Sequence, residues 1–151
     1  MTAFVLDARL LADTIEITTL PLCLVRLMND RRFPWVVLVP ARPGASEIID
    51  LDATDRARLI EEVALVSTAM RDLFRPTKLN VGALGNVVTQ LHLHVIARFA
   101  SDEAWPGPAW GTAPERYRPD EVDQKLAPLR YRLAANARDP AAGTGHGAVN
   151  R

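Results

Sequence analysis

Two histidines stand two residues apart in the stretch Gln90-Leu91-His92-Leu93-His94-Val95-Ile96, and a glutamine precedes them by the same interval. Alternate residues of a β-strand project from one face, so Gln90, His92 and His94 are predicted to form one row while the apolar residues between them face a core. A carboxamide and two imidazoles can donate and accept hydrogen bonds, and a neutral imidazole is also a nucleophile near pH 7. The row therefore predicts a site for a polar ligand.

The elements that must position this row can be predicted from residue patterns. The Gly85-Asn86 turn returns the chain from a strand over 78–83 into the histidine strand as a hairpin. A first hairpin is predicted from strands over 22–28 and 35–39, with a turn at Asn29-Asp30-Arg31-Arg32, and a further strand is predicted over 15–19, ended by Pro21. The run Trp35-Val36-Val37-Leu38-Val39 is continuously apolar, which predicts a strand covered on both faces.

Two longer helices complete the expected fold. Apolar residues recur at three- and four-residue steps over 53–74, with Asp52 or Thr54 available as N-cap, which predicts a long amphipathic helix packed on the sheet. A second helix is predicted over 119–137, with Pro128 expected to kink or interrupt it, and a short helical turn over 7–12. The sequence thus predicts an α+β fold with a largely antiparallel sheet in a single domain over 1–137, followed by a disordered tail over 138–151 that includes His146.

Composition restricts the partners. The 151 residues contain 18 Lys plus Arg and 18 Asp plus Glu, so no overall field would gather nucleic acid or anionic lipid. The one cysteine, Cys23, lies in an apolar run and is expected to be a buried free thiol of a reducing compartment. No secretion signal and no membrane-length apolar stretch is found, which predicts a cytoplasmic location without nucleic-acid or membrane partners.

The histidine row and its surroundings resemble a known family. The segments Leu79-Asn80-Val81-Gly82, Gly85-Asn86 and 90–96 are similar to the signature of the histidine triad (HIT) superfamily of nucleotide hydrolases and transferases, His-φ-His-φ-His-φ-φ with φ apolar. The strand ending Val39-Pro40-Ala41-Arg42-Pro43, the step into a long helix and a later Trp-Pro segment occur in similar order, so the resemblance spans roughly 22–111.

The resemblance implies a role for each matching residue. His92 would attack the α-phosphorus of a nucleotide and form a nucleotidyl-histidine that water hydrolyses, while a main-chain carbonyl holds the proton on its other ring nitrogen. His94 would donate to phosphate oxygens, and Gln90 would occupy the first triad position. The substrate-binding positions implied are Asn29 for ribose, Asn80 for the phosphate or leaving group, and Gly85 and Asn86 for phosphate.

Three departures from the family pattern bear on rate and leaving-group preference. Gln90 replaces a histidine and cannot titrate, so any proton transfer at that position is lost. Val87 stands where many members carry a Ser or Thr that donates to phosphate, a loss worth up to a few kcal/mol in a dry site. The spacer from Asn80 to the triad is one residue shorter. The nucleophile survives all three.

The resemblance implies a homodimer with sheets joined across the interface, no cofactor, and dinucleoside polyphosphates such as diadenosine tetraphosphate, or nucleoside phosphoramidates, as substrates. Two other classes of function stay open. His-X-His on a strand is also a metal-ligand arrangement. A nucleotide-binding module with little catalysis would keep the pocket and lose turnover. Trp105 and Trp110 lie in a proline-rich loop and are predicted to close the edge of the core rather than to stack on a base.

Overall fold

The computed structural model describes residues 2–137 and contains one five-stranded antiparallel sheet. Its strands follow the spatial order β1-β2-β3-β5-β4 and comprise β1 Thr14–Thr19, β2 Cys23–Met28, β3 Trp35–Pro40, β4 Lys78–Gly82 and β5 Leu93–Arg98. Three α-helices, α1 Ala8–Asp13, α2 Ala53–Phe74 and α3 Pro119–Leu133, and two 3-10 turns, η1 Ile48–Asp50 and η2 Ala134–Asn136, complete it. The predicted α+β fold is confirmed, while the tail predicted over 138–151, His146 included, lies outside the described residues.

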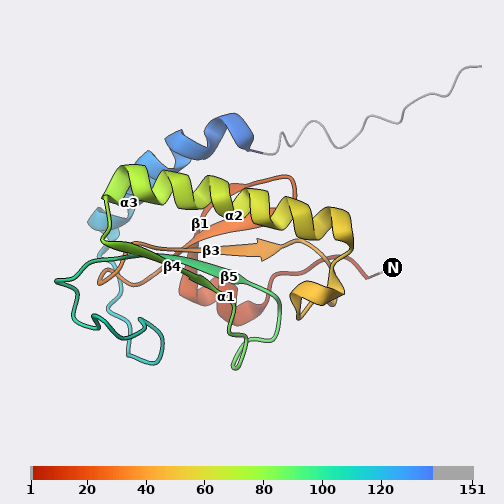
Figure 1. The fold of residues 1–151 in the computed structure, drawn as a ribbon, viewed down its shortest axis with the longest axis horizontal. Helices are drawn as coiled ribbons and strands as arrows, with labels where there is room; N and C mark the ends of the chain where they lie inside the picture. The colour runs from red at the N-terminus through yellow and green to blue at the C-terminus, as the bar shows by residue number, and fades with distance from the viewer. Residues whose placement is uncertain (1, 138–151) are drawn as a thin grey trace, which may run out of the picture.

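The sheet is covered on both faces, because its central strand is apolar throughout. Every residue of β3 is buried, as its unbroken apolar run predicts. Helices α2 and α3 lie on one face, and α1 lies on the other with the segment that follows β5 (Figure 1). The larger core, which includes Leu59, Val66 and Met70 of α2, fills the first side. A smaller cluster around Phe33, Trp35 and Ile96 fills the second side.

The ends of α2 follow from local chemistry. The Asp52 carboxylate accepts the main-chain N–H of Asp55 at 2.8 Å, which satisfies one of the free donors of the first turn. Arg75 ends the helix in the left-handed conformation at φ 49°, directly before Pro76. The helix predicted over 53–74 is thus confirmed with the same bounds.

Two local predictions are wrong. The histidine strand begins at Leu93 and not at Gln90, because the main-chain N–H of Leu91 donates to Ala45 at 3.0 Å and draws the chain away from β3 before residue 93. Helix α3 runs through Pro128 without interruption, and the buried side chains of Leu126, Leu129 and Leu133 pack on the core on both sides of it. Two of the three triad positions therefore precede the strand.

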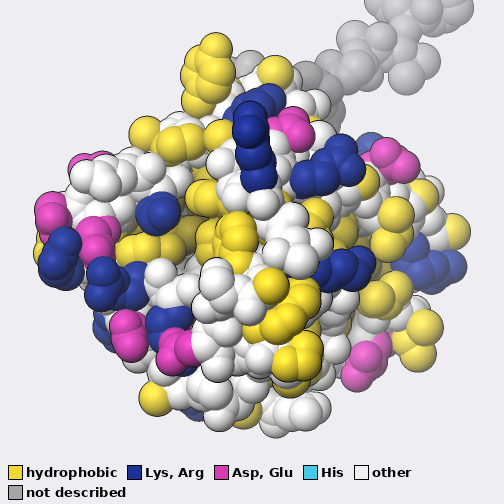
Figure 2. All heavy atoms as spheres, turned by 60° about the vertical axis from the view of Figure 1, so that its left-hand side comes forward, with side chains coloured by type: hydrophobic (Ala, Val, Ile, Leu, Met, Phe, Trp, Pro, Cys, Tyr) yellow, Lys and Arg dark blue, Asp and Glu magenta, His cyan; other side chains and the backbone are white. Residues whose placement is uncertain are grey.

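Charged side chains of both signs are interspersed on the face that comes forward from the left of Figure 1, in keeping with a net charge of zero (Figure 2). No histidine of the described residues is visible on that face. Within residues 2–137, none of the helices combines the length and the hydropathy needed to cross a bilayer.

Candidate functional site

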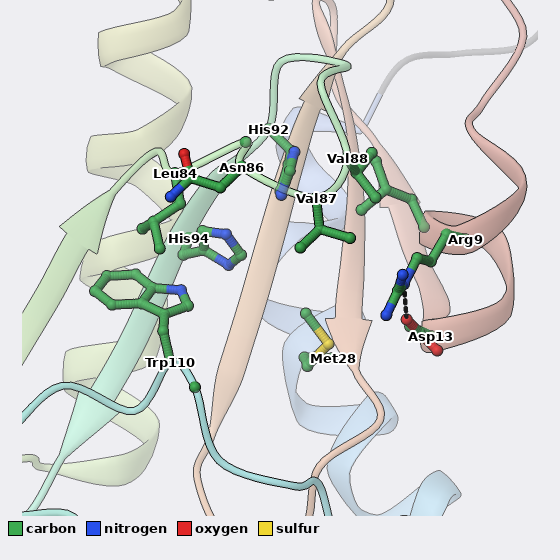
Figure 3. Close-up of a pocket in the computed structure, with 13 residues that line it drawn as sticks. Arg9, Asp13, Met28, Leu84, Asn86, Val87, Val88, His92, His94 and Trp110 are labelled. Atoms are coloured by element: carbon green, nitrogen blue, oxygen red, sulfur yellow. Dashed lines mark ion pairs between the residues drawn. The ribbon is translucent and has the colours of Figure 1, made fainter.

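His92 lies directly before β5 with its ring held by one main-chain carbonyl. Its Nδ1 lies 2.7 Å from the carbonyl oxygen of Gln90, and only 7% of the residue is exposed. A carbonyl can only accept, so the ring proton of neutral His92 is on Nδ1 and the lone pair is on Nε2. Figure 3 shows the outer edge of this ring pointing into the space beside Asn86 and Val87. His92 therefore presents a free nitrogen lone pair to that space.

His94 is held in the opposite tautomer by an indole. The Trp35 Nε1–H donates to Nδ1 of His94 at 2.9 Å. The two side chains share one face of neighbouring strands, because Val37 pairs with His94 and Trp35 lies two residues before Val37. An indole nitrogen can only donate, so the proton of neutral His94 is on Nε2. Burial, and secondarily the charge of nearby His92, lower the pKa of His94 to about 3.

The imidazoles and two indoles form one aromatic cluster. The rings of His92 and His94 have centroids 4.9 Å apart, and the Trp110 ring meets His94 edge to face at 5.4 Å and 77°. Trp110 also packs edge to face on Trp35 at 6.4 Å. Its benzene edge lies over Gly82, where a Cβ would come within 3.7 Å of the indole. Trp110 thus packs against the smaller core cluster and also forms a wall of the site.

A cavity of about 250 Å³ connects these residues with α1 (Figure 3). It is lined by Arg9, Leu10, Asp13, Met28, Leu84, Gly85, Asn86, Val87, Val88, His92, His94, Trp110 and Gly111. Four of the seven predicted site residues, His92, His94, Gly85 and Asn86, therefore meet at one surface. Gly85 adopts φ +73° in the loop that forms the roof, a conformation that residues with a Cβ rarely adopt.

Three predicted site residues do not line this cavity. The Gln90 carboxamide accepts from the main-chain N–H of Asp7 and donates to the carbonyl of Val5, both at 2.9 Å, so it fastens the N-terminal segment. The Asn29 side-chain oxygen accepts from the main-chain N–H of Tyr117 at 2.9 Å. Asn80 accepts from Arg98 at 2.9 Å. Each of the three side chains ties two segments of the chain together, and Gln90 also provides the carbonyl that holds His92.

Sequence reasoning missed Arg9 and Asp13, which line the cavity from α1 as an ion pair with a 3.7 Å separation. Their four-residue spacing is common on solvated helices, so no sequence signal could have singled them out. It also missed Arg98, which is 1% exposed and forms a fork with Asp102 at 2.8 and 2.9 Å. The available signal was the charge of Arg98 directly after the apolar residues Val95-Ile96-Ala97, since a buried charge needs partners.

Within residues 2–137, no group of three or more His, Cys, Asp and Glu side chains is arranged to hold a metal ion. Cys23 is buried and free, and burial raises the pKa of its thiol far above the usual value. The arrangement that the cavity does offer is one nucleophilic nitrogen, one neutral ring N–H donor and a glycine loop.

The chain is similar in sequence and in fold to histidine triad proteins. The family model described as HIT domain matches residues 11–101. A histidine triad protein from Bradyrhizobium japonicum is 45% identical with a TM-score of 0.85, and the match covers 87% of this chain and 99% of that one. One from Marinobacter aquaeolei is 44% identical with a TM-score of 0.87, covering 90% and 100%.

More distant matches show the fold alone. The diadenosine triphosphate hydrolase of Plasmodium falciparum is 14% identical with a TM-score of 0.57, covering 89% of this chain and 84% of that one. No curated protein matches the chain significantly. Since the HIT-domain match covers more than half of the 151 residues, and relatives at 44–45% identity match along nearly their whole length, this chain belongs to the histidine triad (HIT) family.

Proposed function

We propose that the protein is a nucleotide hydrolase or nucleotidyl transferase that acts at the α-phosphate of dinucleoside polyphosphates or nucleoside phosphoramidates, with His92 as the nucleophile. The observation that carries this proposal is the pair of opposite tautomers at one cavity: a lone pair on His92 Nε2 and an N–H on His94 Nε2. Membership of the HIT family and the name of the distant diadenosine triphosphate hydrolase support the same reaction class.

The first chemical step forms a bond between His92 Nε2 and the α-phosphorus and breaks the bond from phosphorus to the leaving group, which takes the bonding electron pair. The His92 ring becomes a cation, and its Nδ1–H stays hydrogen-bonded to the Gln90 carbonyl. That hydrogen bond strengthens as the charge develops, so it stabilises the nucleotidyl-histidine. His94 Nε2–H would donate to a non-bridging phosphate oxygen throughout.

The second step transfers the nucleotidyl group to water. A water oxygen bonds to phosphorus, the P–N bond breaks, and its electron pair returns to His92 Nε2, which restores the neutral ring. The water gives one proton to solvent. Two easier displacements thereby replace one hard one. The Gly85-Asn86 loop would hold the phosphate with its main-chain N–H groups, and Arg9 supplies a cation at the same cavity.

A covalent adduct tests this proposal. Intact-protein mass spectrometry after rapid, acid-free quenching with diadenosine tetraphosphate, and separately with adenosine phosphoramidate, is expected to show a nucleotidyl adduct in the wild type and none in His92→Gly. His92→Ala should likewise lose turnover while its unfolding curve stays close to that of the wild type. Full turnover in a folded His92→Ala protein would refute the assignment. Tight mononucleotide binding without adduct or product would favour a binding module.

We also propose a cytoplasmic homodimer. The only cysteine of the sequence is buried as a free thiol, which suits a reducing compartment. Strand β4 stands at the end of the sheet, and Val81 on it is 48% exposed. An open strand edge with an exposed apolar residue is a surface on which a second sheet can add.

A further inference from the structure

The cavity holds four titratable side chains among the described residues, namely Arg9, Asp13, His92 and His94. Whether any of them can give a proton to a leaving group decides which bonds the site can break. General acid catalysis requires a group that is protonated near neutral pH and able to release that proton. The fixed partners of the four side chains decide this.

His94 is prevented from holding a second proton. Protonation of its Nδ1 would set an imidazolium N–H against the Trp35 Nε1–H, which lies 2.9 Å away and cannot accept. The other groups facing it are the Trp110 ring, from the segment after β5, and His92, directly before β5. Neither carries a negative charge that would favour a cation. Buried neutral His94 therefore offers a hydrogen bond through Nε2–H and is too weak an acid to release that proton near pH 7.

The other three groups are equally unable to act as acids. The Asp13 carboxylate is paired with Arg9 at 3.7 Å and with Arg116 at 3.4 Å, so it has no proton to give. An arginine does not deprotonate in proteins. The Nδ1 proton of His92 is bound to the Gln90 carbonyl, and the Gln90 carboxamide is engaged with Val5 and Asp7. None of the four titratable side chains that line this cavity is therefore a proton donor for a leaving group.

We propose that Trp35 is a positioning residue that keeps His94 a neutral hydrogen-bond donor, and that the site consequently selects substrates whose leaving group departs as an anion without a proton. Polyphosphates are such leaving groups, because a terminal phosphate has a second pKa near 6. Amines, as in nucleoside phosphoramidates, must take up a proton as the P–N bond breaks. The inference rests on the proposed function and chooses dinucleoside polyphosphates between its two substrate classes.

The first step places different demands on the two kinds of leaving group. With a polyphosphate, the P–O electron pair stays on the departing oxygen, and Arg9 at the cavity can offset the added negative charge. With a phosphoramidate, the same electron pair would leave on nitrogen as an amide ion unless a proton arrives. General acids typically contribute about 100-fold or more to such steps. The wild type should therefore prefer the anhydride over the amide by at least that factor in kcat/KM.

A leaving-group series measures this property directly. The substrates are aryl esters of adenosine 5′-monophosphate with phenols of graded pKa, together with diadenosine tetraphosphate and adenosine phosphoramidate. For the wild type we expect log kcat/KM to fall steeply as the leaving-group pKa rises. Trp35→Phe removes the donor that faces His94 Nδ1, and Trp35→His replaces it by a group that can also accept. Trp35→His should show a shallower slope and a relative gain for the phosphoramidate, because an acceptor then faces a second proton on His94 Nδ1.

A matched control and an independent readout separate positioning from structural damage. Trp105→Phe also removes an indole from the aromatic side of the fold, but Trp105 packs over Arg98 and should leave the slope unchanged. The ¹⁵N shifts of His94 should report a single Nε2–H tautomer in the wild type down to pH 5. In Trp35→Phe the ring stays buried but no donor faces Nδ1, so the shifts should report a changed tautomer population. A structural role alone would leave that tautomer population unchanged.

The outcomes are distinct. A flat slope, or comparable hydrolysis of tetraphosphate and phosphoramidate by the wild type, overturns the inference and needs no variant to fold. An unchanged slope in folded Trp35→His together with an unchanged His94 tautomer in folded Trp35→Phe also overturns it. Failure of the proposed function itself would appear differently, as the absence of a His92 adduct even from the ester with the best leaving group.

Discussion

At the scale of single residues, His92 and His94 differ in chemistry because each has a different hydrogen-bond partner. A carbonyl below His92 places the ring proton on Nδ1, and an indole beside His94 places it on Nε2. Neither partner titrates, so both tautomers are fixed by groups that cannot change their role with pH. The nucleophile and the donor are therefore defined by the backbone of Gln90 and the side chain of Trp35 as much as by the histidines.

The lowered pKa of His94 predicts a loss of stability in acid. Below its ordinary pKa of 6.5, His94 binds a proton in the unfolded chain. In the folded protein the pKa of His94 is about 3, so the side chain stays neutral. Its contribution is complete above pH 6.5 and is lost as the pH falls toward 3, at up to about 1.4 kcal/mol per pH unit. Urea unfolding at pH 7.5 and 5 should show a smaller loss in His94→Gln, whose carboxamide oxygen can still accept from Trp35. An equal loss in both proteins would contradict the prediction.

The residue scale also shows what a sequence can reveal of a site. His92 and His94 could be predicted because the two-residue interval between them is a local pattern, although β5 begins only at Leu93. Gln90 belonged to the same interval, yet its carboxamide bonds to Val5 and Asp7, more than 80 positions earlier. Asn29 likewise bonds to Tyr117 across 88 positions. A side chain whose partner lies that far away gives no periodic signal.

At the scale of elements, one buried cation joins the end of β5 to β4 and to the segment that carries both loop tryptophans. The guanidinium of Arg98 donates to Asp102, to Asn80 on β4 at 2.9 Å and to the carbonyl of Gly107 at 2.8 Å. It also lies over the ring of Trp105 at 6.0 Å. Since Trp110 follows Gly107 by three residues, this cluster fixes the segment that forms the wall beside His94.

Arg98→Met is expected to destabilise the fold strongly. The substitution keeps the stem but leaves the Asp102 carboxylate, whose side chain is 6% exposed, without its partner, a change that typically costs about 3–5 kcal/mol. Arg132→Met is the matched control, because its pair with Asp72 is 46% and 39% exposed and should contribute less than about 1 kcal/mol. Urea unfolding of the three proteins measures both effects, and equal stabilities would refute the role of Arg98.

Most elements could be predicted because their signals are local, as the cap at Asp52 and the apolar run of β3 illustrate. The start of β5 could not, since a hydrogen bond from Leu91 to Ala45 decides where the strand leaves its neighbour. The interruption predicted at Pro128 is absent for a related reason. The destabilising effect of proline on an isolated helix is outweighed by the packing of Leu126 and Leu129 on the core.

At the scale of the whole molecule, the two edges of the sheet differ. On β1, the Arg130 side chain of α3 donates to the carbonyls of Ile17 and Glu16 at 3.2 and 2.8 Å, so part of this edge is occupied. Strand β4 is hydrogen-bonded to β5 alone. The fold therefore leaves its free edge on the strand that pairs with the histidine strand, and joining two sheets there would place two sites on one continuous surface.

This asymmetry predicts that the dimer forms through β4 and that a charge on its edge dissociates it. Val81→Asp adds a carboxylate at a 48% exposed position of β4, which would face its own copy across the interface, whereas Ile60→Asp adds the same charge at a 58% exposed position of α2. Light scattering after size exclusion should give a dimer mass for the wild type and Ile60→Asp and a monomer mass for Val81→Asp. A monomeric wild type, or a Val81→Asp protein that stays dimeric, would show that this edge does not carry the interface.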